Sequence, residues 1–138
     1  MGFLLEIVTP EKLVVSEDAN KVVCPGALGE FGVLPGHVPL ISKLRVGELR
    51  YIDTATGSEH YLVITGGLVE VTQNKVTVLA DSCIRRREII DKTKYTAELA
   101  RYEETLKTAE KGTDEYNRAK KEYEFVKVVL KVVDKTQL

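Results

Sequence analysis

This chain of 138 residues has few of the side chains that metal centres and redox sites require. Its two histidines, His37 and His60, lie outside any HExxH pattern, and its two cysteines, Cys24 and Cys83, match no CxxC spacing. Zinc and redox sites need clustered ligands, so we expect no metal site and two reduced, structural cysteines. No GxSxG, Walker or GxGxxG motif is present, and no carboxylate pair or nucleophile–base pair stands out. The sequence therefore gives no positive reason to expect an enzyme.

The sequence also lacks a long apolar run and a surplus of basic residues. No stretch approaches the roughly 18 apolar residues that span a bilayer. The segment 1–7 has neither a basic region nor a small-residue cleavage site, so we expect a soluble, intracellular chain without a signal peptide. The net charge of -1 argues against a nucleic-acid partner, because phosphate neutralisation needs a basic surplus.

Proline and glycine are scarce in the second part of the chain. All four prolines precede residue 85, and Gly112 is the single glycine after it. The charge changes at the same place: residues 1–84 carry 6 Lys/Arg and 10 Asp/Glu, whereas residues 85–138 carry 14 and 11. This shift predicts two domains, 1–84 and 85–138. They are joined near Arg85-Arg86-Arg87, a basic run that we interpret as a solvated hinge rather than as an anion site.

Short apolar runs separated by turns fill the first domain. They cover residues 3–9, 12–15, 21–24, 44–53, 60–65, 68–72 and 75–79. The pair Gly66-Gly67 predicts a bulge or a close backbone approach, and Gln73-Asn74 predicts a hairpin turn. Roughly eight to ten short strands in a domain of this size are typical of a sandwich or a flattened barrel.

The second domain changes to a helical period. Apolar residues spaced by four and three run from Tyr95 to Ala109 and from Tyr116 to Val133, which predicts two helices. Gly112 suits a C′ position and Thr113 an N-cap, so a short loop makes the helices antiparallel neighbours. Residues 125–133 are rich in valine, which favours strands locally, but no turn signal interrupts the helix that leads into them. We predict a helix there, with an apolar face that is buried on two sides.

Residues 24–41 combine sharp bends with apolar side chains. Four of the ten glycines and three of the four prolines lie between Cys24 and Pro39. Each Pro-Gly pair favours a tight turn, so we expect Glu30 and His37 to lie on bends while the apolar residues hold the segment to a core. Such bends either close a sandwich or form a contact surface, and the composition leaves both interpretations open.

Several segments of the first domain resemble the epsilon subunit of F-type ATP synthase. In chain order they are Ile7–Glu11, Pro25-Gly26, Gly29–Leu40, Gly47–Arg50, Gly66–Val71 and Val76–Asp81. The block Gly29–Leu40, which reads GEFGVLPGHVPL, is the most specific of them. The helical hairpin also lies where that family has one. The resemblance implies a β + α fold, in which an N-terminal antiparallel β-sandwich is followed by a C-terminal antiparallel α-helical hairpin.

The resemblance further implies a non-catalytic subunit of the central stalk. The sandwich would bind the gamma subunit and the polar loops of the c-ring, with Glu30, Phe31 and His37 at the ring contact. It would thereby couple ion-driven rotation to ATP synthesis. The chain would reach the membrane only through the complex, at the cytoplasmic face of the bacterial plasma membrane or, alternatively, at the stromal face of the thylakoid.

In many members of that family the hairpin also inhibits ATP hydrolysis. It is permissive when folded on the sandwich, and it blocks hydrolysis when it extends along gamma into the alpha/beta catalytic hexamer. Such a switch needs two packings of one apolar face that differ by a few kcal/mol. The face expected to bind these partners consists of Val126, Val129, Leu130 and Val133.

Some epsilon subunits bind ATP through an Ile/Leu-Asp-x-x-Arg-Ala motif and basic residues of the second helix. Residues 90–95 read IDKTKY here, so Asp91 is kept, but Lys94 and Tyr95 replace the arginine and the alanine. Lysine lacks the planar fork of arginine, and tyrosine adds bulk. The candidate ATP ligands are Asp91, Lys94, Arg118 and Lys121, and no other cofactor is expected. Two alternatives stay open: an ATP-sensing regulatory module, and an unrelated β-sandwich adaptor with a coiled-coil partner.

Overall fold

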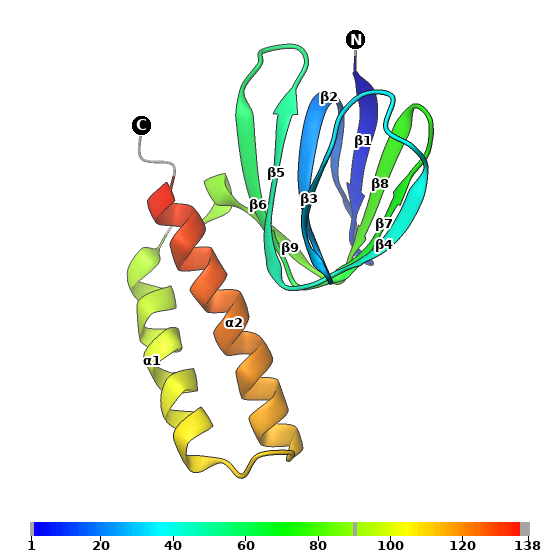
Figure 1. Cartoon of the computed structure of the whole chain (residues 1–138). Coiled ribbons are helices and arrows are strands. Elements are labelled where there is room, and N and C mark those ends of the chain that lie inside the picture. The colour runs from blue at the N-terminus through cyan, green and yellow to red at the C-terminus, as the bar shows by residue number, and fades with distance from the viewer. Residues whose placement is uncertain (1, 90, 136–138) are drawn as a thin grey trace.

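The computed structural model describes residues 2–89 and 91–135, which form a sandwich of strands followed by two helices (Figure 1). The strands are β1 (Phe3–Val8), β2 (Leu13–Gly26), β3 (Gly29–Val33), β4 (Leu40–Leu44), β5 (Gly47–Asp53), β6 (Glu59–Ile64), β7 (Gly67–Val71), β8 (Lys75–Ala80) and β9 (Cys83–Arg85). A 3-10 turn, η1 (Arg86–Glu88), leads to α1 (Lys92–Thr108) and α2 (Asp114–Lys135). The predicted β + α fold class is confirmed.

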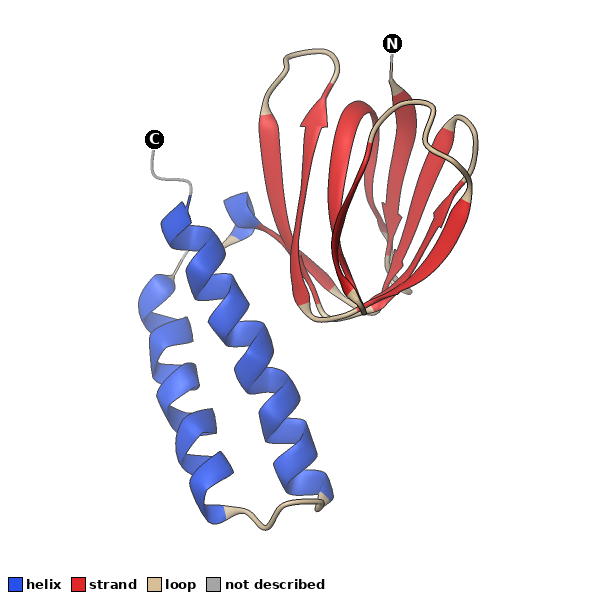
Figure 2. Cartoon of the chain, in the orientation of Figure 1, coloured by secondary structure: helices blue, strands red, loops and turns tan. Residues whose placement is uncertain are grey.

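The strands form two packed layers, with the helices to one side of them (Figure 2). Their order is β1-β8-β7-β4-β2-β5-β6-β9, while β3 pairs with β2 and β1 also pairs with β2. Among the described pairs, β1–β8 is parallel and the others are antiparallel. The parallel pair is possible because β1 and β8 are distant in sequence and need no tight connection between them.

Strand β2 is longer than the sequence indicated. Residues 12–15 and 21–24 were expected to belong to two short strands, but Leu13–Gly26 is one continuous strand of 14 residues. Its first half pairs with β1, and its second half pairs with β5 and β3. The polar residues between the two apolar runs therefore keep a hydrogen-bonded partner strand, and nothing requires a break there.

Alternation along the strands fills the core between the two layers. In β5, the side chains of Leu49, Tyr51 and Asp53 point inward, and those of the residues between them are only half-buried. Fully buried core residues include Leu5, Ile7, Val22, Cys24, Val33, Leu62, Ile64, Val69 and Val78. Burial raises the pKa of the Cys24 thiol to about 12, so this cysteine remains protonated and packs as an apolar side chain.

Two turns that the sequence marked are present at β7 and β8. The Thr72 N–H donates to the Lys75 carbonyl at 2.9 Å, which confirms the hairpin between these strands. Gly67 has φ +140°, and a Cβ at this position would lie 2.0 Å from the Leu79 carbonyl oxygen. The close backbone approach predicted at Gly66-Gly67 is therefore confirmed, because only glycine fits against β8 there.

The two helices form an antiparallel hairpin. Thr113 is the N-cap of α2, as predicted, because its Oγ1 accepts from the Tyr116 N–H at 3.2 Å. Helix α1 ends at Thr108, so Gly112, with φ +89°, turns the connecting loop rather than occupying the C′ position that we expected. The valine-rich stretch 125–133 is helical, as predicted.

Helix α2 packs against the outer face of β6. Val63, Val129 and Val132 are each 0% exposed and form the centre of this contact. Half-buried residues around them are Tyr61, Ile84, Ile89, Tyr95, Phe125 and Val128. Since α1 lies along another side of α2, the second helix is covered on two sides (Figure 1). This burial outweighs the weak helix propensity of its valines.

Candidate interaction surfaces

Glu30 lies within β3, and His37 lies in the loop that follows this strand. Glu30 is a strand residue opposite Pro25 of β2, which corrects our expectation that it sits on a bend. His37 follows the turn at Pro35-Gly36, in the loop between β3 and β4, and its backbone N–H donates to the Leu34 carbonyl at 3.1 Å. The structure therefore does not bring Glu30 and His37 together, and of the two only Glu30 lies on β3, an edge strand of the sandwich.

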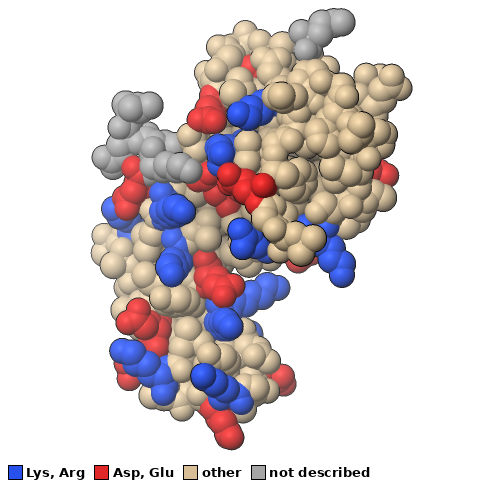
Figure 3. Space-filling model, viewed as in Figure 1, with Lys and Arg blue, Asp and Glu red and all other residues tan. Residues whose placement is uncertain are grey.

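This edge combines exposed backbone with exposed apolar side chains. Within the described strands, β3 pairs with β2 alone, and Phe31 is half-buried against the core. Leu28, in the turn before β3, is fully exposed, while Leu34 and Val38 are 57% and 70% exposed. The sandwich face in view in Figure 3 is largely uncharged. An edge strand flanked by exposed apolar residues suits a protein partner.

A second apolar surface lies on the outside of β1, β8, β7 and β4. Leu68 of β7 is directly opposite Leu79 of β8, which is opposite Val8 of β1. Leu79 is 50% exposed, and Ile41 of β4 is 67% exposed. Helix α2 covers the other layer, so these side chains have no cover from the described part of the chain. A cross-strand row of this kind is typical of a surface that a partner covers.

Arg50 gathers carboxylates from three strands on the outer face of β5. Its guanidinium donates to Glu30 at 3.2 and 3.3 Å and to Glu48 at 2.9 Å, and its Nε lies 4.0 Å from a carboxylate oxygen of Glu59. The bond to Glu30 is the main reason that the pKa of Arg50 is raised. Acidic side chains are visible in Figure 3 where the sandwich meets the hairpin. Alternation along β5 already places Glu48 and Arg50 on one face, whereas Glu30 and Glu59 reach Arg50 only through strand register.

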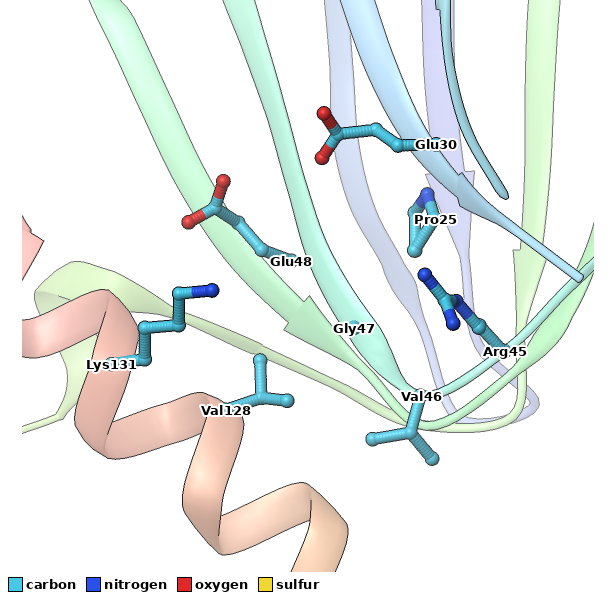
Figure 4. A pocket seen from close by; sticks show the side chains of 8 residues that line it. All are labelled: Pro25, Glu30, Arg45, Val46, Gly47, Glu48, Val128 and Lys131. Carbon is cyan, nitrogen blue, oxygen red and sulfur yellow. The ribbon is translucent and has the colours of Figure 1, made fainter. Parts of the chain in front are cut away.

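A cleft of about 310 Å³ lies between this network and α2. Its lining consists of Pro25, Glu30, Arg45, Val46, Gly47, Glu48, Val128 and Lys131. Figure 4 shows the side chains of Glu48 and Lys131 extending toward one another across the cleft, while Arg45 lies on its other side. The sandwich thus presents both signs of charge to α2 at the border of the apolar contact.

A second polar network holds the loop between β5 and β6. His60 Nε2 lies 2.7 Å from Asp53 Oδ2, and the hydroxyl and the backbone N–H of Thr56 both donate to Asp53. The bonds from Thr56, followed by the bond from His60, lower the pKa of Asp53 to about 2. Strand alternation offered a signal for this network, since Asp53 has the same parity as the buried Leu49 and Tyr51.

The same network continues to the end of the sheet. The Tyr51 ring stacks on His60 with 4.8 Å between the ring centroids. The Tyr51 hydroxyl donates to Glu17 at 2.9 Å and accepts from Arg85 at 3.2 Å. Arg85 also donates to the Val14 carbonyl at 3.4 Å, so it is a bonded residue of β9. The expectation of a solvated hinge at residues 85–87 is therefore wrong for Arg85.

The candidate ATP ligands lie toward opposite ends of the hairpin. Asp91 caps α1, because its carboxylate accepts from the Lys94 N–H at 3.3 Å. This end of α1 lies beside the end of α2, since Lys92 Nζ is 2.5 Å from Asp134 Oδ1. Arg118, near the start of α2, lines a shallow groove with residues that include Arg101 and Tyr102. Lys121 is exposed. Ile90 lies outside the described residues. The structure therefore separates Asp91 and Lys94 from Arg118 and Lys121.

The candidate partner-binding residues of α2 divide between two environments. Val126 and Val129 are buried, whereas Leu130 and Val133 are half-buried. Val129 faces the sandwich and contacts Val63, which the sequence did not mark as a contact residue. By helical spacing, the other three residues turn toward α1. The predicted face is thus covered by this chain itself in the docked arrangement.

The described residues offer two exposed apolar surfaces, the β3 edge and the outer face of β1, β8, β7 and β4. Within residues 2–89 and 91–135, no three His, Cys, Asp or Glu side chains are grouped to hold a metal ion. In the same residues, no helix has the length and apolar character needed to cross a membrane. The fold is a β-sandwich with a helical hairpin docked on it, and its exposed apolar surfaces are of the kind that other chains cover.

Comparison with known proteins identifies the family. Residues 3–86 match the model of the ATP synthase delta/epsilon chain β-sandwich domain. The ATP synthase epsilon chain of Desulfatibacillum aliphaticivorans is 46% identical over 113 residues, which cover 82% of this chain and 79% of the relative. The epsilon chain of Nitratidesulfovibrio vulgaris (strain DP4) is 53% identical over 85 residues, and the match spans 62% of either chain. This chain belongs to the ATP synthase delta/epsilon family.

Solved structures support the same fold. One similar chain comes from the mitochondrial ATP synthase of Euglena gracilis, in a structure of OSCP, F1 and the c-ring. It superimposes with a TM-score of 0.84 at 19% identity, and the match covers 96% of this chain and 81% of that one. A chain in the central stalk and c-ring structure of the Tetrahymena thermophila mitochondrial ATP synthase gives a TM-score of 0.59 at 16% identity, with 96% and 97% coverage. Both likenesses include the hairpin as well as the sandwich.

Proposed function

We propose that this chain is the epsilon subunit in the central stalk of a rotary ATP synthase, where it couples ion-driven rotation of the c-ring to ATP synthesis. The observation that carries this proposal is the pair of uncovered apolar surfaces on a sandwich of the epsilon-chain family. The chain acts by holding other subunits in register, and the chemistry of ATP takes place elsewhere in the complex. Its association with the membrane, at the cytoplasmic face of the bacterial plasma membrane, is indirect and depends on the complex.

The outer face of β1, β8, β7 and β4 is the proposed contact for the gamma subunit. Leu68, Leu79 and Ile41 offer a flat apolar surface on rigid strands. Full burial of an exposed apolar side chain contributes about 1.5–3 kcal/mol, and since these side chains are 36–67% exposed, covering them would contribute roughly half of that each.

The β3 edge is the proposed contact for the polar loops of the c-ring. Glu30 and Phe31 lie on β3, and exposed Leu34 and Val38 lie beside His37. Since Glu30 lies near the start of β3 and His37 lies in the loop after this strand, the contact is extended and would engage more than one point of the ring.

The two-part division into sandwich and hairpin is the proposed basis of regulation. The hairpin is held on β6 by a small apolar centre of Val63, Val129 and Val132. Release of this centre would free α2 to extend along gamma into the alpha/beta hexamer and inhibit hydrolysis. A contact of this size is consistent with two states that differ by a few kcal/mol.

The test compares two versions of the chain on a reconstituted catalytic head with gamma. One is the full chain, and the other ends at Arg87. The end at Arg87 is chosen because it keeps β9 paired with β6, whereas a chain that ended at Ser82 would lack β9. Both should bind gamma, and only the full chain should slow ATP hydrolysis. Failure of both chains to bind gamma would overturn the stalk role. Equal hydrolysis rates would overturn the inhibitory role alone.

A further inference from the structure

The charge network around Arg50 borders the surface on which α2 docks. Glu48 of β5 is directly opposite Val63 of β6, and Val63 is buried under Val129 of α2. Cross-strand neighbours have Cβ atoms about 5 Å apart, so the Glu48 side chain lies at the rim of the apolar contact. It is only 10% exposed, which limits screening of its charge by solvent.

Helix α2 brings a positive charge to the same place. Lys131 lies two residues beyond Val129, and it lines the cleft together with Glu30 and Glu48 (Figure 4). Glu48 and Lys131 extend toward one another across this cleft, so the attraction between them favours the docked position of the helix. Arg45 is also in the cleft, on its far side, and opposes this attraction weakly.

Arg50 is shared between two carboxylates that face different surroundings. It binds Glu48 at 2.9 Å beside α2, and it binds both oxygens of Glu30, a residue that is 50% exposed on the β3 edge. Together Glu30, Glu48, Glu59 and Arg50 carry a net charge of about -2 toward Lys131 when all are ionised. Any change in the charge of Glu30 alters this sum and also alters how much of the guanidinium is available to Glu48.

We propose that Arg50 couples the exposed carboxylate of Glu30 to the docking of α2, through Glu48 and Lys131. Neutralising Glu30 leaves more of the guanidinium charge to Glu48 and to Glu59, so the attraction for Lys131 falls and the hairpin is released more readily. Removing the charge of Arg50 has the opposite effect. If the proposed function holds, a basic group of a partner that pairs with Glu30 releases the hairpin, and a change at the β3 edge thereby regulates inhibition.

The experiment uses the full chain alone, so its outcome is independent of the proposed function. Val129→Cys places a thiol at the buried centre of the contact, and Cys83→Ser removes the half-buried native thiol; Cys24 is fully buried. The rate of thiol modification then measures the undocked fraction. At low salt, E30Q and E48Q should each raise this rate by about two- to fivefold, the range of partly exposed charge pairs.

Three further variants make the proposal decisive. R50Q should lower the rate, K131Q should raise it, and E30Q should have no further effect in the K131Q background. K120Q, at an exposed position of the same helix, is the matched control and should change nothing. All differences should shrink in 0.5 M salt. An E30Q effect that persists without Lys131, an R50Q effect of the same sign as E30Q, or unchanged rates in all variants would overturn the proposal.

Discussion

The apolar centre of the docking contact offers the sharpest prediction. Val129→Ala removes two methyl groups from a side chain that is 0% exposed and packed against Val63 and Val132. At about 0.8 kcal/mol per buried carbon, the docked state should lose about 1.6 kcal/mol, or slightly more if a cavity remains. Because 1.4 kcal/mol corresponds to a factor of ten, the ratio of docked to undocked chains should fall by roughly 10- to 30-fold.

Single-molecule energy transfer would measure this ratio. Labels attached through Ala55→Cys and Lys111→Cys report the distance between the exposed β5–β6 loop and the exposed tip of the hairpin. Lys127→Ala is the matched control, since Lys127 is exposed on the same helix and should leave the ratio unchanged. The reasoning would be refuted if Val129→Ala left the distance distribution unchanged, or if it lowered the unfolding temperature of the sandwich together with that of the hairpin.

Three other predictions concern the sandwich and the start of α1. The pKa of Asp53 is depressed from 3.8 to about 2, so its ionised form stabilises the fold at neutral pH, and this contribution is lost as the pH falls from about 4 toward 2. Asp53→Asn should therefore lower the melting temperature at pH 7, and the melting temperature of this variant should decrease less between pH 4 and pH 2. An unchanged slope of melting temperature against pH would contradict the assignment. Gly67→Ala forces a Cβ to within 2.0 Å of the Leu79 carbonyl oxygen at φ +140°, so the free energy of unfolding measured in urea should fall by more than about 2 kcal/mol. Gly57→Ala is the control: the space around Gly57 is open and its φ is +73°, so this variant should lose less free energy of unfolding. Asp91→Ala removes the N-cap of α1 and should cost about 1 kcal/mol of helix stability, measured by circular dichroism. We also expect inhibition of hydrolysis to respond little to ATP bound to this chain. A micromolar dissociation constant for ATP that is abolished by Asp91→Ala would favour the alternative of an ATP-sensing module.

Local patterns were sufficient to predict most of the secondary structure. The hairpin between β7 and β8, the close approach at Gly67 and the N-cap at Thr113 each depend on residues within a few positions of one another. The helical period of 116–133 also predicted a helix against the local preference of its valines. Burial on two sides was foreseeable from the width of the apolar face, because the period of a helix fixes which side chains share a side.

The candidate sites depended on contacts that local patterns do not encode. Glu30 was expected on a bend because glycines and a proline surround it, but pairing with Pro25 extends the backbone into β3 and separates Glu30 from His37. The candidate ATP ligands Asp91 and Arg118 were considered together on family resemblance. Their positions in antiparallel helices place them toward opposite ends of the hairpin.

The sequence by itself determined the local conformations, the alternation of buried and exposed positions, and the change from strands to helices near residue 85. Tertiary structure alone decided that Arg50 meets carboxylates from β3, β5 and β6, and that Arg85 closes a network with Tyr51. It also decided that α2 docks over Val63. Glu48 and Glu59 lie 2 and 9 positions from Arg50, but the other contacts join residues 20 to about 70 positions apart. Their formation depends on strand register and on the packing of whole elements, which no short stretch of the chain specifies.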